Sequence, residues 1–298
     1  MSINPFTQEQ KYRSFITLQN YILDCNKNYK KFFIGRLSGN ENVLISKVLL
    51  KQPFPQYLMN NMLYVAGIKF NDINDILKYT EMYNKSVKAT TLLGVWDCDM
   101  YKQEEAHLNY LVKVYPHIKQ IAAHALEPYY YMPSFRYKFN EIFKNKKVLI
   151  ISSHKKTIEE QIVNLDKLYK KEIFDKTTLF KVYKPVQQNA GSNDNNSWLF
   201  HFNKMKEDIK NIKNNDFDFD IALVSAGGFG MILSEFIYSE LNSSVMYIGG
   251  ALQLFFGING GRWNNNETIK NVQNKYWTNV LKEDLPKNPK LCENSSYW

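Results

Sequence analysis

The feature that most constrains the fold is a short apolar run followed by a helix pattern, and this unit recurs along the chain. The clearest run is VLIIS at 148–152, rich in β-branched residues and typical of a strand buried on both faces. Strands are also expected at 31–34, 91–96, 120–123, 179–183, 220–224 and 244–248. Strands that alternate with helices predict an open, mostly parallel Rossmann-like α/β sheet with helices on both faces.

Apolar residues at helical spacing predict the helices between these strands. The predicted helices lie at 8–30, 42–51, 104–114, 134–143, 157–169, 198–212, 231–241 and from 251 onward. No internal repeat or linker-like segment divides the pattern. We therefore expect one α/β domain over 1–298, with an N-terminal lobe of about 1–145 and a C-terminal lobe of about 146–298.

Composition excludes several classes of protein. The 44% of hydrophobic residues and 15% of aromatic residues are ample for a packed core. No apolar run approaches the roughly 20 residues of a membrane span, and the N-terminus lacks a secretory pattern, so we expect a cytoplasmic protein. The cysteines Cys25, Cys98 and Cys292 are too far apart to indicate a disulfide framework or a zinc site. The net charge of +9 is spread along the chain, so no nucleic-acid partner is expected.

The strongest candidate site is the segment IALVSAGGFGMILSEF. Ser225, Gly227 and Gly230 occupy the first, third and sixth positions of a GxGxxG turn, and Gly228 lies between them. Such a turn between a strand and a helix directs backbone N–H groups and the positive end of the helix toward a pyrophosphate. The alternative is that these glycines only allow close packing of the helix on the strand.

The same segment argues against NAD. A dinucleotide site needs an acidic residue about 20 positions after the turn, at the end of the next strand, to bind a ribose. That strand ends in YIGG, which contains no acid. We therefore expect a nucleotide diphosphate rather than NAD.

A second glycine turn, IGGALQLFFGINGGRW, follows the last strand. In a parallel sheet it would lie beside the first turn, at the edge where ligands bind. Arg262 could pair with a phosphate, and Trp263 could stack on a base or a sugar or simply pack in the core. The candidate ligand-binding residues here are Gly249, Gly250, Gln253, Arg262 and Trp263.

A third glycine turn lies near the N-terminus, in FFIGRLSGNE. Gly35 and Gly39 flank a strand-to-helix turn that also carries Arg36 and Glu41. These two charged residues are the catalytic candidates, for a phosphate and for a sugar hydroxyl or a metal. The alternative is that Glu41 only caps the helix and that Arg36 is its salt-bridge partner.

Asp97 and Asp99, in GVWDCDM, form a DxD pair just after a predicted strand. Two carboxylates at this spacing could hold Mn²⁺ or Mg²⁺ against a nucleotide diphosphate, or they could be solvated turn residues. Motifs of common hydrolases are missing: there is no GxSxG and no HExxH. Of the histidines, only His154 lies at a plausible strand end.

With these residues in view, the chain resembles a family of bacterial and viral proteins found with polysaccharide biosynthesis and related to the D-type (GT-D) glycosyltransferase fold. The stretches that carry the resemblance are IGRLSGNE, ALEPYYY, VLIISSHKKTIEEQ, the loop at 187–198, VSAGGFG, IGGALQLFFGINGGRW and CENSSYW. The related fold has an arginine, glycine and acidic signature, with an aspartate two positions before a glutamate, that is implicated in nucleotide-sugar and metal binding. Arg36 and Glu41 match this signature, whereas Gly39 stands in the place of the aspartate.

The resemblance and the residues together predict a transferase. It would move a sugar from a nucleotide-diphosphate sugar to a glycan or glycoprotein acceptor, with the diphosphate near 225–230 and Glu41 as base or metal ligand. The first alternative is a non-catalytic protein of the same fold that binds a nucleotide or glycan. The second is a nucleotide-dependent oxidoreductase, against which the missing ribose acid argues.

Overall fold

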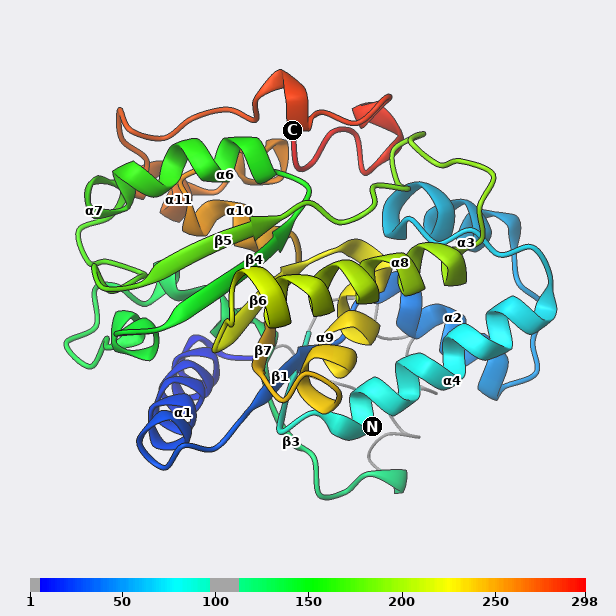
Figure 1. The fold of residues 1–298 in the computed structure, drawn as a ribbon, viewed down its shortest axis with the longest axis horizontal. Coiled ribbons are helices and arrows are strands. Elements are labelled where there is room, and N and C mark those ends of the chain that lie inside the picture. The colour runs from blue at the N-terminus through cyan, green and yellow to red at the C-terminus, as the bar shows by residue number, and fades with distance from the viewer. Residues whose placement is uncertain (1–5, 97–112) are drawn as a thin grey trace.

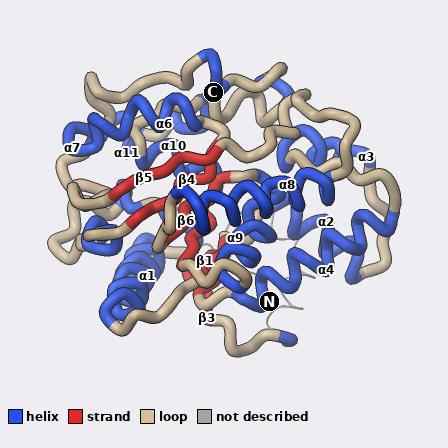
Figure 2. Tube along the Cα trace, viewed as in Figure 1, coloured by secondary structure: helices blue, strands red, loops and turns tan. Residues whose placement is uncertain are grey.

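A seven-stranded parallel sheet forms the centre of the computed structural model, which describes residues 6–96 and 113–298 (Figures 1 and 2). The strand order is β3-β2-β1-β7-β6-β4-β5, and every pair of neighbours is parallel. The strands are β1 Phe33–Arg36, β2 Leu92–Val95, β3 Lys119–Ala122, β4 Lys147–Ser152, β5 Leu179–Tyr183, β6 Ile221–Ser225 and β7 Ser244–Tyr247. The predicted fold class, an open Rossmann-like α/β sheet, is confirmed.

Helices cover both faces of this sheet, and each face has its own hydrophobic core (Figure 1). One core is closed by α1 Gln8–Lys27, α6 Lys155–Gln161, α7 Leu165–Leu168, α10 Leu252–Phe255 and α11 Glu267–Val272. The other is closed by α2 Gly39–Leu49, α3 Gln56–Asn61, α4 Ile73–Ala89, α8 Trp198–Asn211 and α9 Gly230–Ser239.

Strand β4 illustrates why the sequence folds this way. Val148 and Ile150 point into the first core, Leu149 and Ile151 point into the second, and all four are fully buried. Burying one such side chain contributes about 1.5–3 kcal/mol, so a run without polar residues is stable only in the middle of a three-layer fold.

Divergent connections line the carboxyl edge of the sheet. The chain leaves β1 and β6 toward α2 and α9 on one face, and it leaves β7 and β4 toward α10 and α6 on the other face. In the strand order β1-β7-β6-β4, neighbouring connections therefore diverge at each step. Open α/β sheets bind ligands where neighbouring connections diverge, so the topology by itself places the site beside the ends of these four strands.

The helix predicted at 134–143 is wrong. The structure has turns there, followed by a short 3₁₀ helix over Phe139–Phe143. The buried side chain of Gln19 in α1 explains the difference, because its amide donates to the carbonyl of Arg136 and accepts from the N–H of Lys138. Backbone groups that a helix would use are thus bonded to α1.

Helix α4 was not predicted, although it is one of the longest. Its buried face carries Ile76, Tyr79, Tyr83 and Val87 at helical spacing, so this periodic pattern was present in the sequence and was missed. The predicted helix at 157–169 is divided by a 3₁₀ turn into α6 and α7. The helix predicted at 104–114 lies almost entirely outside the described residues.

Among the helices of the described segments, none has the length and apolar character needed to cross a membrane.

Gly230 tests how tightly α9 packs on β7. A Cβ atom at this position would lie 2.1 Å from the ring of Tyr247, so Gly230→Ala should lower the free energy of unfolding by roughly 1–3 kcal/mol. Chemical denaturation measures this change. Ser239→Ala, at an exposed position of the same helix, is the matched control and should change stability by less than about 0.5 kcal/mol. Equal effects of the two variants would show that the contact is loose.

Candidate functional site

A cavity of about 450 Å³ lies at the carboxyl edge of the sheet. Its wall includes residues that follow β1, β3, β4, β6 and β7, together with the loop at 185–189 and the C-terminal segment 293–298. The crevices between these strands therefore open into one space.

Arg36, the last residue of β1, is the central cation of this cavity. Its guanidinium carbon lies 5.1 Å from the ring centroid of Tyr247 and 5.4 Å from that of Trp96. Gly249 gives it room, because a Cβ there would lie 2.1 Å from a guanidinium nitrogen and the backbone has a φ of +71°. Its Nε is buried without a hydrogen-bond partner among the described residues.

Glu41 lies in the first turn of α2, whose N-cap is Ser38. The side chain is only 4% exposed, yet the residue belongs to the cavity wall. Burial raises the pKa of Glu41, while hydrogen bonding to its own backbone N–H and the nearby charge of Arg36 act in the opposite direction. The carboxyl therefore interacts with the first turn of α2 and lies near the charge of Arg36, but the two side chains are not within ion-pair distance of each other.

Glu127 is a second carboxyl in the cavity wall, and the sequence analysis assigned it no role. It follows β3 between two 3₁₀ turns. Burial raises its pKa to about 7, although the charges of Arg36 and Arg262 lower it. The position of Glu127 just after a predicted strand could have identified it, because the same pattern singled out Asp97.

His154 lies in the cavity wall just after β4 and is 5% exposed. Burial lowers its pKa to about 4, so the ring is neutral at pH 7. The ring packs edge-on against Trp298 at 6.2 Å, and its Nε2 has no hydrogen-bond partner within the described part of the chain.

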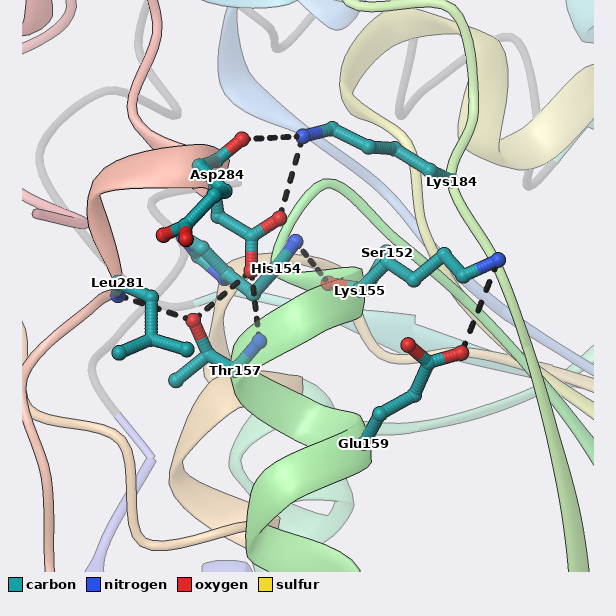
Figure 3. A network of polar contacts seen from close by, with 9 residues as sticks. Ser152, His154, Lys155, Thr157, Glu159, Lys184, Leu281 and Asp284 are labelled. Atoms are coloured by element: carbon teal, nitrogen blue, oxygen red, sulfur yellow. Dashed lines mark hydrogen bonds and ion pairs between the residues drawn. The ribbon is translucent and has the colours of Figure 1, made fainter.

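A buried polar network holds the turn that carries His154 (Figure 3). The carboxylate of Asp284 accepts hydrogen bonds of 2.8 Å from both the N–H and the hydroxyl of Thr157, and it pairs with Lys184 at 3.1 Å. These donors keep the pKa of Asp284 low in spite of its burial. The Thr157 hydroxyl in turn accepts from the N–H of Leu281 at 3.0 Å. The network thus fixes the start of α6 and the chain segment above it.

The first glycine turn divides into two parts. Ser225 and Gly227 line the cavity, and Gly227 has a φ of +51° at a place where a Cβ would lie 2.6 Å from the carbonyl oxygen of Ala66. Gly228 and Gly230 instead lie in the packing layer behind it, where a Cβ would meet Ile68 and Tyr247. Only the front of the turn is available to a ligand.

Hydrogen bonds and an ion pair join the second glycine turn to the C-terminal segment. Arg262 donates to the hydroxyl of Tyr297 at 3.0 Å and pairs with Glu293 at 3.3 Å. Gln253 is buried, and its amide donates to the carbonyls of Asn259 and Tyr297. Its role in the structure is to tie this segment down.

The structure thus brings most of the predicted residues together. The cavity wall contains Arg36, Gly39, Glu41, Ser225, Gly227, Gly249, Gly250, Arg262 and Trp263. Four predicted residues are not part of it: Gly35, Gly228, Gly230 and Gln253. Gly35 lies inside the sheet, where a Cβ would be 2.4 Å from the methyl group of Thr90.

A metal site does not form from the residues that the structure describes. Within 6–96 and 113–298, no group of three His, Cys, Asp or Glu side chains could hold a metal ion. The predicted ligands Asp97 and Asp99 lie outside the described residues. Binding of Mn²⁺ or Mg²⁺ by Asp97 and Asp99 stays a prediction.

The sheet, its divergent connections and the cavity agree with a comparison against protein families. The family model described as a GT-D fold-like domain matches residues 36–255. This chain belongs to the GT-D fold-like family. The match begins at Arg36 and includes both front residues of the first glycine turn, whereas Arg262, Trp263 and the segment 293–298 lie beyond it. No curated protein and no solved structure matches the chain.

The raised pKa of Glu127 predicts a measurable pH dependence of stability. Because this pKa is about 7 in the folded protein against 4.5 for a free carboxyl, the stabilising contribution is complete below pH 4.5 and is lost as pH rises through 7. Relative to Glu127→Gln, the wild type should therefore lose up to roughly 1.4 kcal/mol per pH unit across this window. Denaturation of both proteins between pH 4.5 and 8 gives the difference, and Glu141→Gln, at an exposed site, is the control. Parallel curves for wild type and Glu127→Gln would contradict the assignment.

Proposed function

We propose that this GT-D fold-like protein is a glycosyltransferase that moves a sugar from a nucleotide-diphosphate sugar to a glycan or glycoprotein acceptor. The observation that carries the proposal is the charge of Arg36 in the cavity wall. The ion pairs of the described residues do not include Arg36. The carboxyls that lie near it among the described residues, Glu41 and Glu127, are not within ion-pair distance, so an anionic ligand would still compensate this partly buried cation.

The surroundings of Arg36 suit a diphosphate in particular. A guanidinium binds phosphate oxygens through two parallel hydrogen bonds, and its neighbours Gly249 and Gly227 allow backbone to approach the same space. Trp96, Tyr247 and Trp263 add flat apolar surfaces on which a base or a sugar ring could stack. Transfer from such a donor depends mainly on positioning and on stabilising the charge of the leaving diphosphate, which Arg36 would provide.

Other polar groups of the wall favour a polar ligand over an apolar one. Within the described ranges, Gln187 Nε2, His154 Nε2 and Trp298 Nε1 are buried without hydrogen-bond partners. Native proteins rarely leave such groups unpaired, so these atoms support hydroxyl-bearing ligands such as sugars. Glu41 would hold Arg36 in place and contact the donor.

Removing the charge of Arg36 should weaken binding of nucleoside diphosphates. A hydrogen bond to a charged group contributes about 1.5–3 kcal/mol, so Arg36→Met should raise the Kd for the preferred diphosphate by roughly 10-fold to 100-fold. Titration calorimetry with UDP and GDP measures this change. Arg136→Met removes an exposed arginine outside the cavity and should leave the Kd unchanged. Equal Kd values for wild type and Arg36→Met would remove Arg36 from the ligand site.

Gly249→Ala tests the same site without removing a charge. The added methyl group would overlap the Arg36 guanidinium and would also strain a left-handed backbone conformation. We expect weaker diphosphate binding, by about 10-fold or more, together with a loss of roughly 1 kcal/mol in stability. A variant that loses stability but binds as well as wild type would show that the position of Arg36 does not matter for binding.

The identity of the ligand separates the proposal from its two rivals. In thermal-shift titrations, UDP, GDP or their sugars should stabilise the protein and NAD should not, because no acid follows β7 to bind a ribose. Stabilisation by NAD alone would favour the oxidoreductase reading. Stabilisation by a nucleotide sugar without turnover, over a broad range of acceptors and with Mn²⁺ or Mg²⁺ present or absent, would favour a non-catalytic binding protein.

A further inference from the structure

The proposed function assigns no role to Glu127, a carboxyl in the cavity wall. Its backbone is fixed on both sides, because its N–H donates to the carbonyl of His124 at 3.1 Å and its carbonyl accepts from the N–H of Tyr130 at 3.2 Å. Pro128 follows and restricts the backbone of Glu127 further. A rigid support of this kind suits a group that must meet a reacting atom in one geometry.

The charges around Glu127 come from three different elements. Arg36 approaches from β1, Arg262 from the 3₁₀ turn Gly261–Trp263, and the more distant Lys11 from α1. The hydroxyl groups of Tyr129, Tyr130 and Tyr131 also belong to the titratable surroundings. The two arginines stabilise the carboxylate form and so oppose the effect of burial on the pKa of Glu127. Such a group can take up and release a proton at pH 7.

Glu41 is less suited to move a proton. It is nearly fully buried at 4% exposure and is engaged with the N-terminus of its own helix. Glu127 is only half-buried, so it can return a proton to solvent after each cycle. Both carboxyls lie near Arg36, and this nearness places Glu127 beside the expected position of the diphosphate.

We propose that Glu127 is the catalytic base of the transfer, an assignment that rests on the proposed glycosyltransferase function. As the acceptor hydroxyl oxygen forms its bond to the anomeric carbon, its proton passes to the Glu127 carboxylate. The bond between the anomeric carbon and the phosphate oxygen breaks, and its electron pair leaves with the nucleoside diphosphate beside Arg36. Glu127 then releases the proton to solvent, so no oxidant or reductant is needed.

The test compares Glu127→Gln with Glu41→Gln and the exposed control Glu141→Gln. Turnover is followed as nucleoside diphosphate released from UDP- and GDP-sugars, and Kd for the product diphosphate is measured on the same preparations. Glu127→Gln should lower kcat by about 100-fold or more. The Kd should stay within about 3-fold or become tighter, because a negative charge near the arginines is removed. Glu141→Gln should behave as wild type.

Two further readouts distinguish a base from a structural residue. The wild-type kcat should rise with pH to a plateau, and this rising limb should be lost in Glu127→Gln. Added formate should restore part of the kcat of Glu127→Ala but not that of Glu41→Ala, because formate can occupy the space of the missing carboxylate. A Glu127→Gln variant with wild-type kcat and an unchanged pH limb would overturn the assignment and leave the transferase function standing. A wild type that binds no nucleoside diphosphate would instead refute the proposed function itself, and with it this role.

Discussion

The placement of one positive charge organises the functional end of this fold. Arg36 ends β1 at the crevice between β1 and β7, where Tyr247 and Trp96 pack against its guanidinium and Gly249 leaves space for it. The acidic groups nearest to it are not within ion-pair distance among the described residues, and burial raises the pKa of both Glu41 and Glu127. The diphosphate that we propose as ligand would supply the negative charge that balances this cation.

The rest of the chain serves this arrangement through packing. The parallel sheet brings the ends of β1, β7 and β6 together, and the packing glycines behind the first turn let α9 approach β7 closely. Beyond the matched domain, Arg262 and Tyr297 join the second glycine turn to the C-terminal segment and complete the wall. The matched domain contains Arg36, and the segment 293–298 beyond it lines the same cavity.

Much of this was predictable because the signals are local. Strand-turn-helix units with glycine at the turn identify the sheet, Arg36, Glu41 and the fronts of both glycine turns without any knowledge of tertiary contacts. Glu127 was missed because its pKa depends on burial and on Arg36 and Arg262, which are distant in sequence. The roles of Gly230 and Gln253 also depend on remote partners.

We propose that the cavity holds a diphosphate against Arg36. A crystal structure of the protein grown with UDP or GDP would test this directly. We expect electron density for two phosphate groups at the carboxyl ends of β1 and β7, with the guanidinium of Arg36 within hydrogen-bond distance of their oxygens. A nucleotide bound elsewhere on the molecule, with Arg36 still packed only against Trp96 and Tyr247, would contradict diphosphate binding at Arg36.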